Sequence, residues 1–160
     1  MKIVSIDIGT RNMGLCVYVN KKLTHFDCYD LFDYVKKKER TDYSLMVINF
    51  IREHNKIFSD MDVILLENQI QARMKIIMTT FRVFFWGKSV RISPLAVHNF
   101  FRTGNKGKHK ENKKSAIKLV GQFLNKRQVE IITKHKKKDD IADSIIQVHY
   151  YLGRGKIKKK

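Results

Sequence analysis

The stretch KIVSIDIGTRNMGLCVYV, residues 2–19, decides the fold of this 160-residue chain. Its first part, Lys2–Ile8, is a β-branched apolar run of the kind that forms a buried central strand. Within Met13–Val19, apolar residues alternate with smaller or polar ones, which predicts a second, half-buried strand. The chain therefore opens with two neighbouring strands, and an acidic residue, Asp7, stands at the end of the first.

Further strands follow from the same reasoning. Asn20-Lys21-Lys22 turns the chain into a third strand, Leu23–Tyr29. Asp62–Leu66 is apolar enough to be buried on both faces, and Val90–Ile92 is a candidate short strand. The first three strands form a meander, and helical crossovers make the later ones parallel. We therefore expect an α/β fold with a mixed sheet, a three-stranded antiparallel meander plus parallel strands, flanked by helices.

Helices are predicted between and after these strands. The first has Leu45, Ile48 and Ile51 at helical spacing, with Thr41 or Asp42 as its cap. The others are expected at Gln69–Trp86, from Ser93-Pro94 onward, at Glu111–Leu124, and through Ile141, Ile145, Val148 and Leu152. The glycine- and lysine-rich stretch Arg102–Lys114 is expected to be an exposed loop. We expect one domain, residues 1–160, whose basic tail Arg154–Lys160 is disordered.

The composition narrows the classes of protein that this chain can represent. A hydrophobic content of 43% with a single proline is that of a globular domain. No apolar run reaches the ~18 residues of a membrane span, and the N-terminus does not resemble a signal peptide. The two cysteines, Cys16 and Cys28, have no CxxC spacing, so free thiols in a reducing compartment are expected.

The positive charge is concentrated in one segment. The chain has a net charge of +18, and residues 68–138 carry 18 Lys and Arg against 2 acids, which is +16. Residues 1–67 are balanced, with 10 basic and 10 acidic side chains. A solvated lysine surface usually includes glutamates, so this segregation favours a polyanionic partner, nucleic acid first. An anionic membrane is the weaker alternative, because no basic amphipathic helix or lipidation motif accompanies the charge.

Two acids end apolar strands. Asp7 is followed by Gly9 and Thr10, which suit a turn that approaches a phosphate or a metal ion. Actin-like ATPases and sugar kinases begin similarly, but they need two such lobes, and Asp7 could simply cap a turn. Glu67 follows four apolar residues, where an ionised carboxylate needs compensation by a cation unless the strand ends in solvent.

The string KKDDIADS, residues 137–144, supplies two more acids. Asp140 and Asp143 are three residues apart and share a helix face, although Asp139 with Asp143 is also geometrically possible. Acids are common at helix N-termini for dipole reasons alone. However, several acids that converge in one place cannot all stay ionised without cations, so the set predicts divalent metal. In a protein that binds polyanions, such a site favours metal-assisted phosphodiester cleavage.

The order of these motifs resembles the RuvC-type Holliday junction resolvases of the RNase H-like superfamily. A strand-end Asp, then Gly9, Asn12 and Gly14, a strand-end Glu, and lysines before Asp-x-x-Asp all stand in that family's order. The chain is most similar to the poxvirus branch, that of avian poxviruses in particular, over essentially its whole length. The resemblance implies two Mg²⁺ ions, replaceable by Mn²⁺, on Asp7, Glu67, Asp140 and Asp143. It also implies a catalytic, positively charged residue near the cleaved phosphate, for which the candidates are Lys110, Lys113 and Lys114.

The implied function is a structure-selective endonuclease that resolves four-way DNA junctions by paired nicks leaving 5′ phosphates. Such an enzyme acts as a homodimer, and the resemblance implies viral concatemer resolution in the host cytoplasm. An RNase H-like ribonuclease acting on RNA or RNA–DNA hybrid remains an alternative. So does a non-catalytic basic DNA-packaging protein, which would leave the strand-end acids unexplained.

The remaining expectations concern DNA contacts and the dimer. The expected nucleic-acid-binding residues are Arg102, Lys106, Lys108, Lys110, Lys113, Lys114, Lys136, Lys137 and Lys138, and His109 and His135 are expected to join them. Aromatic residues could stack on junction bases but suit a core or a dimer interface better; they are Phe81, Phe84, Phe85, Trp86, Phe100 and Phe101. Ile76, Phe84 and Trp86 lie off the main apolar face of Gln69–Trp86, so we expect this helix to form the dimer interface.

Overall fold

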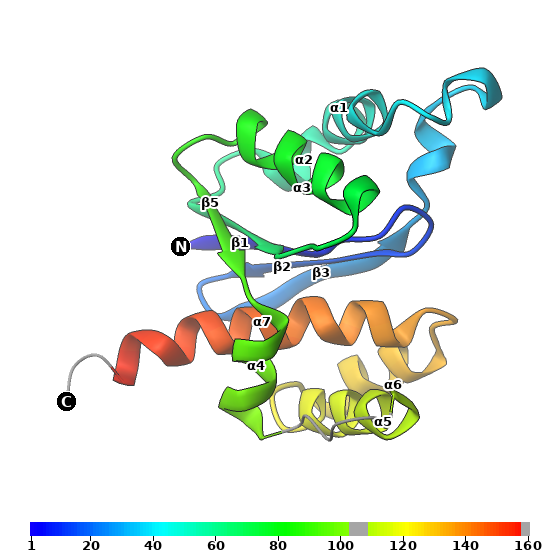
Figure 1. The fold of residues 1–160 in the computed structure, drawn as a ribbon. Coiled ribbons are helices and arrows are strands. Elements are labelled where there is room, and N and C mark those ends of the chain that lie inside the picture. The colour runs from blue at the N-terminus through cyan, green and yellow to red at the C-terminus, as the bar shows by residue number, and fades with distance from the viewer. Residues whose placement is uncertain (103–108, 158–160) are drawn as a thin grey trace.

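A five-stranded mixed sheet organises the molecule (Figure 1), in a computed structural model that describes residues 1–102 and 109–157. The spatial order is β3-β2-β1-β4-β5. β1, β2 and β3 are antiparallel neighbours, whereas β4 runs parallel to β1 and β5 parallel to β4. The expected meander with added parallel strands is therefore confirmed. The strands are β1 (Lys2–Asp7), β2 (Met13–Val19), β3 (Lys22–Tyr29), β4 (Val63–Glu67) and β5 (Ser89–Ile92).

Helices cover both faces of this sheet (Figure 1). One layer holds the 3-10 turns η1 (Leu31–Tyr34) and η2 (Lys37–Glu39) with the helices α1 (Tyr43–Glu53), α2 (Asn55–Phe58) and α3 (Ala72–Phe84). The other holds α4 (Pro94–Phe101), α5 (His109–Val120), α6 (Lys126–Lys134) and α7 (Lys138–Ile157). The result is three layers, with the sheet in the middle.

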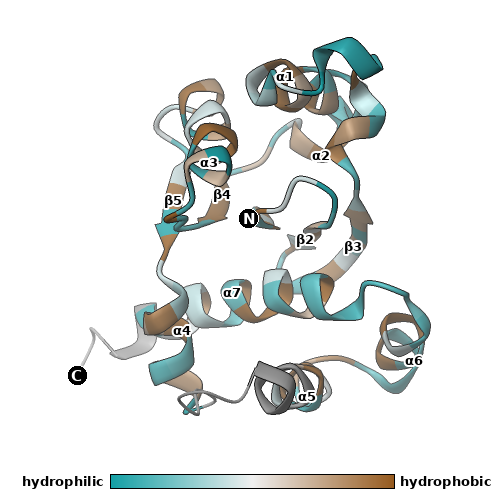
Figure 2. Ribbon diagram, turned by 45° about the vertical axis from the view of Figure 1, so that its right-hand side comes forward, coloured by the Kyte–Doolittle hydropathy of each residue, from teal (hydrophilic) through white to brown (hydrophobic). Residues whose placement is uncertain are grey.

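Each face of the sheet has its own hydrophobic core. Val4 and Ile6 of β1 join Phe50 of α1 and Phe81 of α3 on one side. Ile3 joins residues of β2 and α7 on the other side, including Ile145. Figure 2 shows hydrophobic residues along the strands and on parts of the helices beside them. Alternate residues of β1 thus belong to opposite cores, which explains why this strand is apolar along most of its length.

β2 departs from the expectation of a half-buried strand. All of its residues except Val19 are buried. Its small residues, Gly14 and Cys16, face α7 rather than solvent, and α7 contacts β2 more than any other strand. Alternation of large and small residues here therefore reflects a close helix contact and not an exposed face.

The helix caps follow the sequence. Asp42 caps α1 by accepting a hydrogen bond from the backbone N–H of Leu45 at 2.9 Å. Ser93 caps α4, with Pro94 as its first residue. The buried face of α1 was only partly predicted, since it consists of Met46, Val47, Phe50 and Ile51.

Two further expectations are corrected. Arg102–Lys114 is not a loop throughout, because α5 begins at His109 and packs on α7. The tail is helical as far as Ile157, and the guanidinium of Arg154 lies 5.6 Å from the Tyr150 ring centroid, one turn earlier. Residues 103–108 and 158–160 lie outside the described residues. Within the described residues, no helix is long and apolar enough to cross a membrane.

Candidate active site

Asp7 and Glu67 end neighbouring parallel strands. Ile6 of β1 pairs with Leu66 of β4, so the next residue of each strand emerges at the same edge of the sheet. The two carboxyl groups form a side-chain hydrogen bond with each other. Parallel pairing thus places the two strand-end acids side by side, as sites on open α/β sheets require.

Gly14 lets α7 bring two more acids to this edge. It pairs with Asp7 across β1 and β2. The backbone carbonyl of Asp140 lies against Gly14 so closely that a Cβ there would overlap it. A residue with a side chain would force the first turn of α7 away from β2, so the glycine is required for this contact.

The electrostatics of Asp7 show that the four acids interact. Burial raises the pKa of Asp7 well above its usual value, and the hydrogen bond and charge of Glu67 add to this. The charges of Asp143 and then Asp140 raise the pKa of Asp7 further. Each of these influences favours the protonated form of Asp7, and a bound cation would oppose them.

The donor set fits hard divalent cations. Carboxylate oxygens are the ligands that Mg²⁺ and Mn²⁺ prefer. Within the described part of the chain, no three His, Cys, Asp or Glu side chains are already arranged around one point. A cation bound here would compete with the hydrogen bond between the Asp7 and Glu67 carboxyl groups.

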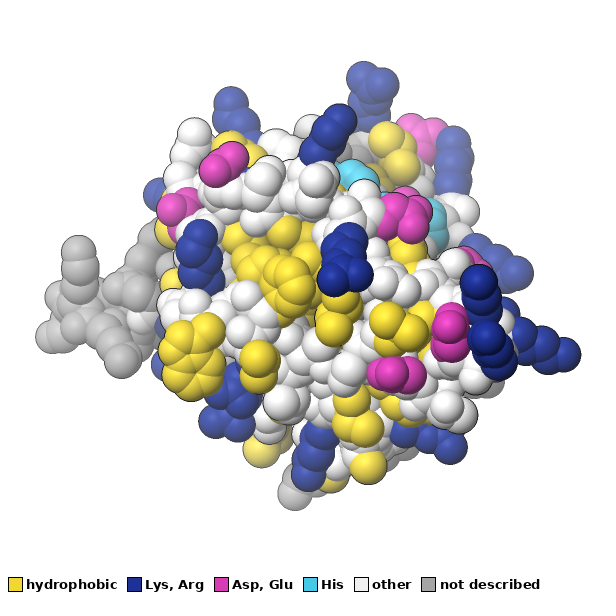
Figure 3. Space-filling model, turned by 90° about the horizontal axis from the view of Figure 1, so that it is seen from above, with side chains coloured by type: hydrophobic (Ala, Val, Ile, Leu, Met, Phe, Trp, Pro, Cys, Tyr) yellow, Lys and Arg dark blue, Asp and Glu magenta, His cyan; other side chains and the backbone are white. Residues whose placement is uncertain are grey.

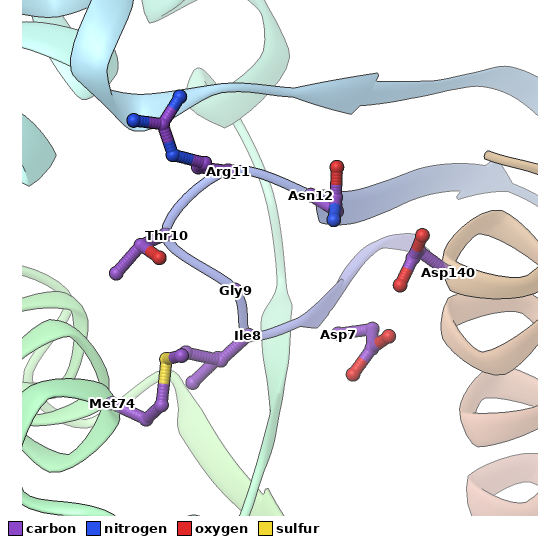
Figure 4. Close-up of a pocket in the computed structure, with 8 residues that line it drawn as sticks. All are labelled: Asp7, Ile8, Gly9, Thr10, Arg11, Asn12, Met74 and Asp140. Atoms are coloured by element: carbon purple, nitrogen blue, oxygen red, sulfur yellow. The ribbon is translucent and has the colours of Figure 1, made fainter. Parts of the chain in front are cut away.

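A pocket of about 380 Å³ opens beside the acids (Figure 4). Asp7 and Asp140 lie at one side of it, and the turn between β1 and β2 forms another wall. Gly9 keeps this turn tight, because a Cβ there would meet the carbonyl of Asn12. The complete lining is Asp7, Ile8, Gly9, Thr10, Arg11, Asn12, Met74 and Asp140. Arg11 and Met74 were not anticipated from the sequence.

Cys28 and Lys137 lie near the acids. Cys28 pairs with Gly14, so Asp7, Gly14 and Cys28 form a row across the sheet. Burial and then the charge of Asp140 raise the pKa of the Cys28 thiol to about 12, while Lys137 opposes this. Lys137, expected to bind DNA, is therefore a cation close to the acids. Both cysteines are free thiols, as expected.

The expected basic residues are only partly described. Arg102 is exposed at the end of α4, in a left-handed conformation with φ of 55°. Lys136 and Lys138 are exposed at the start of α7. His135 faces Asp27 at 3.5 Å, so it lies in an ion-pair position with a protein carboxylate. The side chains of Lys106, Lys108, His109, Lys110, Lys113 and Lys114 lie outside the described residues.

The aromatic residues divide into core and surface. Phe81 is fully buried, and Phe85, Phe100 and Phe101 pack against the two cores. Phe84 and Trp86 are 50% and 81% exposed. Figure 3, seen from the side of α1 and α3, shows hydrophobic side chains gathered at the centre of this face with Lys and Arg around them. The expectation that Ile76, Phe84 and Trp86 lie off the core-facing side is confirmed, and Val83 joins them.

Solved structures share this fold. The Holliday junction resolvase of fowlpox virus superposes with a TM-score of 0.67 at 23% identity, covering 96% of this chain and 99% of that one. The yeast mitochondrial Holliday junction resolvase gives 0.67 at 16% identity, over 98% and 85% of the two chains. RuvC of T. thermophilus, solved with a Holliday junction, gives 0.58 at 16% identity, over 97% and 96%. The expected RuvC-type, RNase H-like fold is therefore confirmed.

Sequence comparison supplies the family. No curated protein matches the chain. The family model described as "Poxvirus A22 protein" matches residues 1–154, which includes all four candidate metal ligands and both helical layers. The expectation of an avian poxvirus as source goes beyond this match and stays a prediction. The chain belongs to the poxvirus A22 protein family.

Proposed function

We propose that this protein is a metal-dependent endonuclease that resolves four-way DNA junctions. The observation that carries the proposal is the convergence of Asp7, Glu67, Asp140 and Asp143 at one corner of the sheet. Support comes from the fold, which is that of Holliday junction resolvases, and from the excess of basic residues in the chain. Each of these features alone fits other proteins, but together they favour phosphodiester cleavage in nucleic acid.

The four acids would hold two Mg²⁺ ions. When bound, such ions activate a water for in-line attack and stabilise the leaving 3′ oxygen. The role of Asp7 is central, because it lies between Glu67 and the α7 acids in the interaction network. Loss of its proton makes it a ligand, so the affinity for metal should rise with pH as the Asp7 carboxyl ionises. Lys137 would hold the phosphate of the strand near these acids.

The substrate is proposed to be branched DNA, held through its phosphates. The basic residues of 68–138 would neutralise these phosphates and make the affinity strongly dependent on salt. A four-way junction has pairs of symmetry-related strands, so paired cuts call for a twofold dimer. The dimer interface would consist of exposed apolar residues on α3 and just after it: Ile76, Val83, Phe84 and Trp86. Single exposed apolar side chains are common on protein surfaces, but several on one segment indicate a contact surface.

The test is a cleavage assay on three labelled substrates of equal length: a four-way junction, a duplex, and an RNA–DNA hybrid. We expect paired nicks with 5′ phosphates in the junction, only with Mg²⁺ or Mn²⁺, and little cutting of the other two. Preferential cutting of the hybrid would instead identify a ribonuclease. Tight junction binding without cutting in any metal would identify a DNA-packaging protein.

A further inference from the structure

Two arginines that are distant in sequence meet over one aromatic ring beside the pocket. The guanidinium of Arg11 lies 4.7 Å from the centroid of the Phe32 ring, and that of Arg40 lies 5.4 Å from the same centroid. Arg11 belongs to the turn between β1 and β2, Phe32 to η1, and Arg40 follows η2. We call these three residues the arginine–phenylalanine cluster. Nothing in the motif pattern of the sequence pointed to it.

The backbone around the cluster is fixed. The N–H of Leu31 donates to the carbonyl of Thr10 at 2.8 Å, which ties η1 to the β1–β2 turn. Asp30 caps η1 by accepting a hydrogen bond from the N–H of Phe32 at 2.9 Å. Both contacts hold Phe32 beside Arg11, so the ring and the guanidinium are positioned before any ligand arrives.

The positive charge of the cluster is only partly compensated. Arg11 faces one carboxylate oxygen of Asp30 at 3.5 Å, a long contact, and its side chain is 63% exposed. Asp30 already uses its other oxygen for the helix cap. Among the described residues Arg40 has no carboxylate within ion-pair distance. Two guanidinium groups on one ring repel each other, and an anion between them would turn this repulsion into attraction.

The cluster adjoins the site where the proposed reaction takes place. Arg11 lines the same pocket as Asp7 and Asp140, from the opposite side of the turn (Figure 4). Three exposed lysines, Lys36, Lys37 and Lys38, precede Arg40 in the chain. If the strand to be cut follows the pocket from the acids to the β1–β2 turn, a neighbouring phosphate would come within reach of Arg11. An arginine can bind such a phosphate through two N–H groups while its flat face stays on the ring.

We infer that Arg11 and Arg40, stacked on Phe32, form a phosphate-binding subsite for the nucleic-acid strand that is cut, next to the cleaved bond. This inference rests on the proposed function. Arg11 acts as a positioning residue, because it holds a neighbouring phosphate and not the reacting one. The subsite fixes the register of the strand in the pocket and thereby selects which phosphate reaches the acids.

The first measurement is equilibrium binding of the four-way junction without metal, over a range of salt concentrations. Arg11→Gln and Arg40→Gln should each weaken binding about tenfold at low salt. Each should reduce the slope of log affinity against log salt by about 0.9. The matched control is Lys22→Gln, which removes one exposed charge at the other end of the sheet, where Lys22 pairs with Val19. We expect the control to bind like the wild type.

The second measurement locates the contact. One phosphate at a time in the cut strand is replaced by a neutral methylphosphonate, on either side of the cleavage point. At one linkage next to the cut, the wild type should lose about tenfold in affinity, whereas Arg11→Gln should lose nothing more. Arg11→Lys should restore part of the affinity, because it keeps the charge but loses the paired N–H groups. A thermal unfolding curve for each variant separates loss of contact from loss of fold.

The outcomes separate this inference from the proposed function. If the wild type binds the junction but Arg11→Gln and Arg40→Gln behave like Lys22→Gln, the subsite does not exist. The subsite is also ruled out if methylphosphonates reduce the affinity of Arg11→Gln as much as that of the wild type at every linkage. If the binding results are as expected but no metal supports cutting, the subsite stands and the proposed nuclease activity fails. A wild type that binds no nucleic acid contradicts both.

Discussion

At the scale of one residue, Asp7 shows that a candidate metal ligand can reduce the stability of the fold. Its pKa is raised in the folded protein by burial and by three neighbouring acids. The proton-bound form is therefore favoured, and the carboxylate contributes less stability as the pH rises through the folded-state pKa. Removing the charge should relieve this cost, but it should also remove the central ligand of the proposed metal pair.

We expect Asp7→Asn to raise the free energy of unfolding at neutral pH by on the order of 1 kcal/mol when metal is absent. Adding Mg²⁺ should stabilise the wild type and leave the variant nearly unchanged, since only the wild type binds the ion in its folded state. Thermal unfolding with and without Mg²⁺ measures both effects. Equal stabilisation of both proteins by Mg²⁺ would place the metal site elsewhere.

The choice of acids on α7 can be tested residue by residue. The negative charges of Asp143 and Asp140 both raise the pKa of Asp7. Asp140→Asn and Asp143→Asn should therefore abolish junction cleavage, by at least about 100-fold, and preserve or strengthen junction binding. Asp139→Asn is the matched control and should keep most activity. If Asp139→Asn were the more damaging variant, the ligand pair would be Asp139 and Asp143.

His149 gives a prediction for pH. Its ring stacks on Phe123 with centroids 3.9 Å apart, and its Nε2 is 3.0 Å from the hydroxyl of Tyr18. Burial lowers the pKa of His149 to about 4. The unfolded chain takes up a proton near pH 6.5 and the folded chain does not, so stability present above pH 6.5 is lost as the pH falls toward 4.

The expected loss of unfolding free energy between pH 6.5 and 4.5 is on the order of 1–3 kcal/mol. His149→Gln should show a shallower pH dependence over the same range, because the titrating group is gone. Urea unfolding at several pH values measures the unfolding free energy of both proteins. Parallel curves for the wild type and the variant would mean that His149 titrates in the same way in both states.

At the scale of elements, the contact between β2 and α7 determines the site. Gly14 receives the backbone of Asp140, and the row Asp7, Gly14, Cys28 runs beneath the first turn of α7. Ser5 of β1 donates to Gln147 at 3.2 Å, a buried hydrogen bond that fixes α7 on the sheet further along. The helix is therefore held in register near its middle, while Gly14 permits its N-terminal turn to come close.

We expect Gly14→Ala to displace the start of α7 and to destabilise the fold by roughly 1–3 kcal/mol, the usual cost of overpacking. Junction cleavage should fall by a larger factor than this loss of stability explains, because Asp140 and Asp143 move away from Asp7. Gly121→Ala is the control, since the atom nearest to a Cβ there would be the Lys118 carbonyl oxygen, at 3.3 Å. Full activity of Gly14→Ala at a temperature where it is folded would contradict this role.

At the scale of the whole molecule, the exposed apolar residues of α3 and the segment after it call for a partner. Trp86 is 81% exposed, Val83 67% and Phe84 50%. Charged substitutions, Phe84→Glu or Trp86→Glu, should give a folded monomer that nicks junctions but no longer makes paired cuts in one binding event. Sedimentation of free protein and of the junction complex measures the assembly.

The control is Leu95→Glu on α4, a 68% exposed apolar residue outside the proposed interface. A wild type that stays monomeric on the junction would refute the dimer.

The sequence by itself determined the strands, the caps and the identity of the acids. These depend on local chemistry: apolar runs such as Lys2–Ile8 bury themselves, and Asp42 and Ser93 satisfy backbone N–H groups a few residues away. Acids at the ends of such runs can be recognised without knowing what they face. The helix α6 was not predicted, because it is only nine residues long and Ile132 is its only buried residue.

Only the tertiary structure decided what meets at the site. The register of β1 on β4 sets Asp7 beside Glu67, and the small size of Gly14 and Cys16 lets α7 cover a face that alternation had assigned to solvent. The cluster of Arg11, Phe32 and Arg40 depends on the backbone contact between Thr10 and Leu31. Such contacts join residues that are tens of positions apart, and their geometry is set by packing of whole elements. No local pattern in the sequence encodes that packing, which brings the four acids together at one edge of the sheet and the two arginines onto one ring.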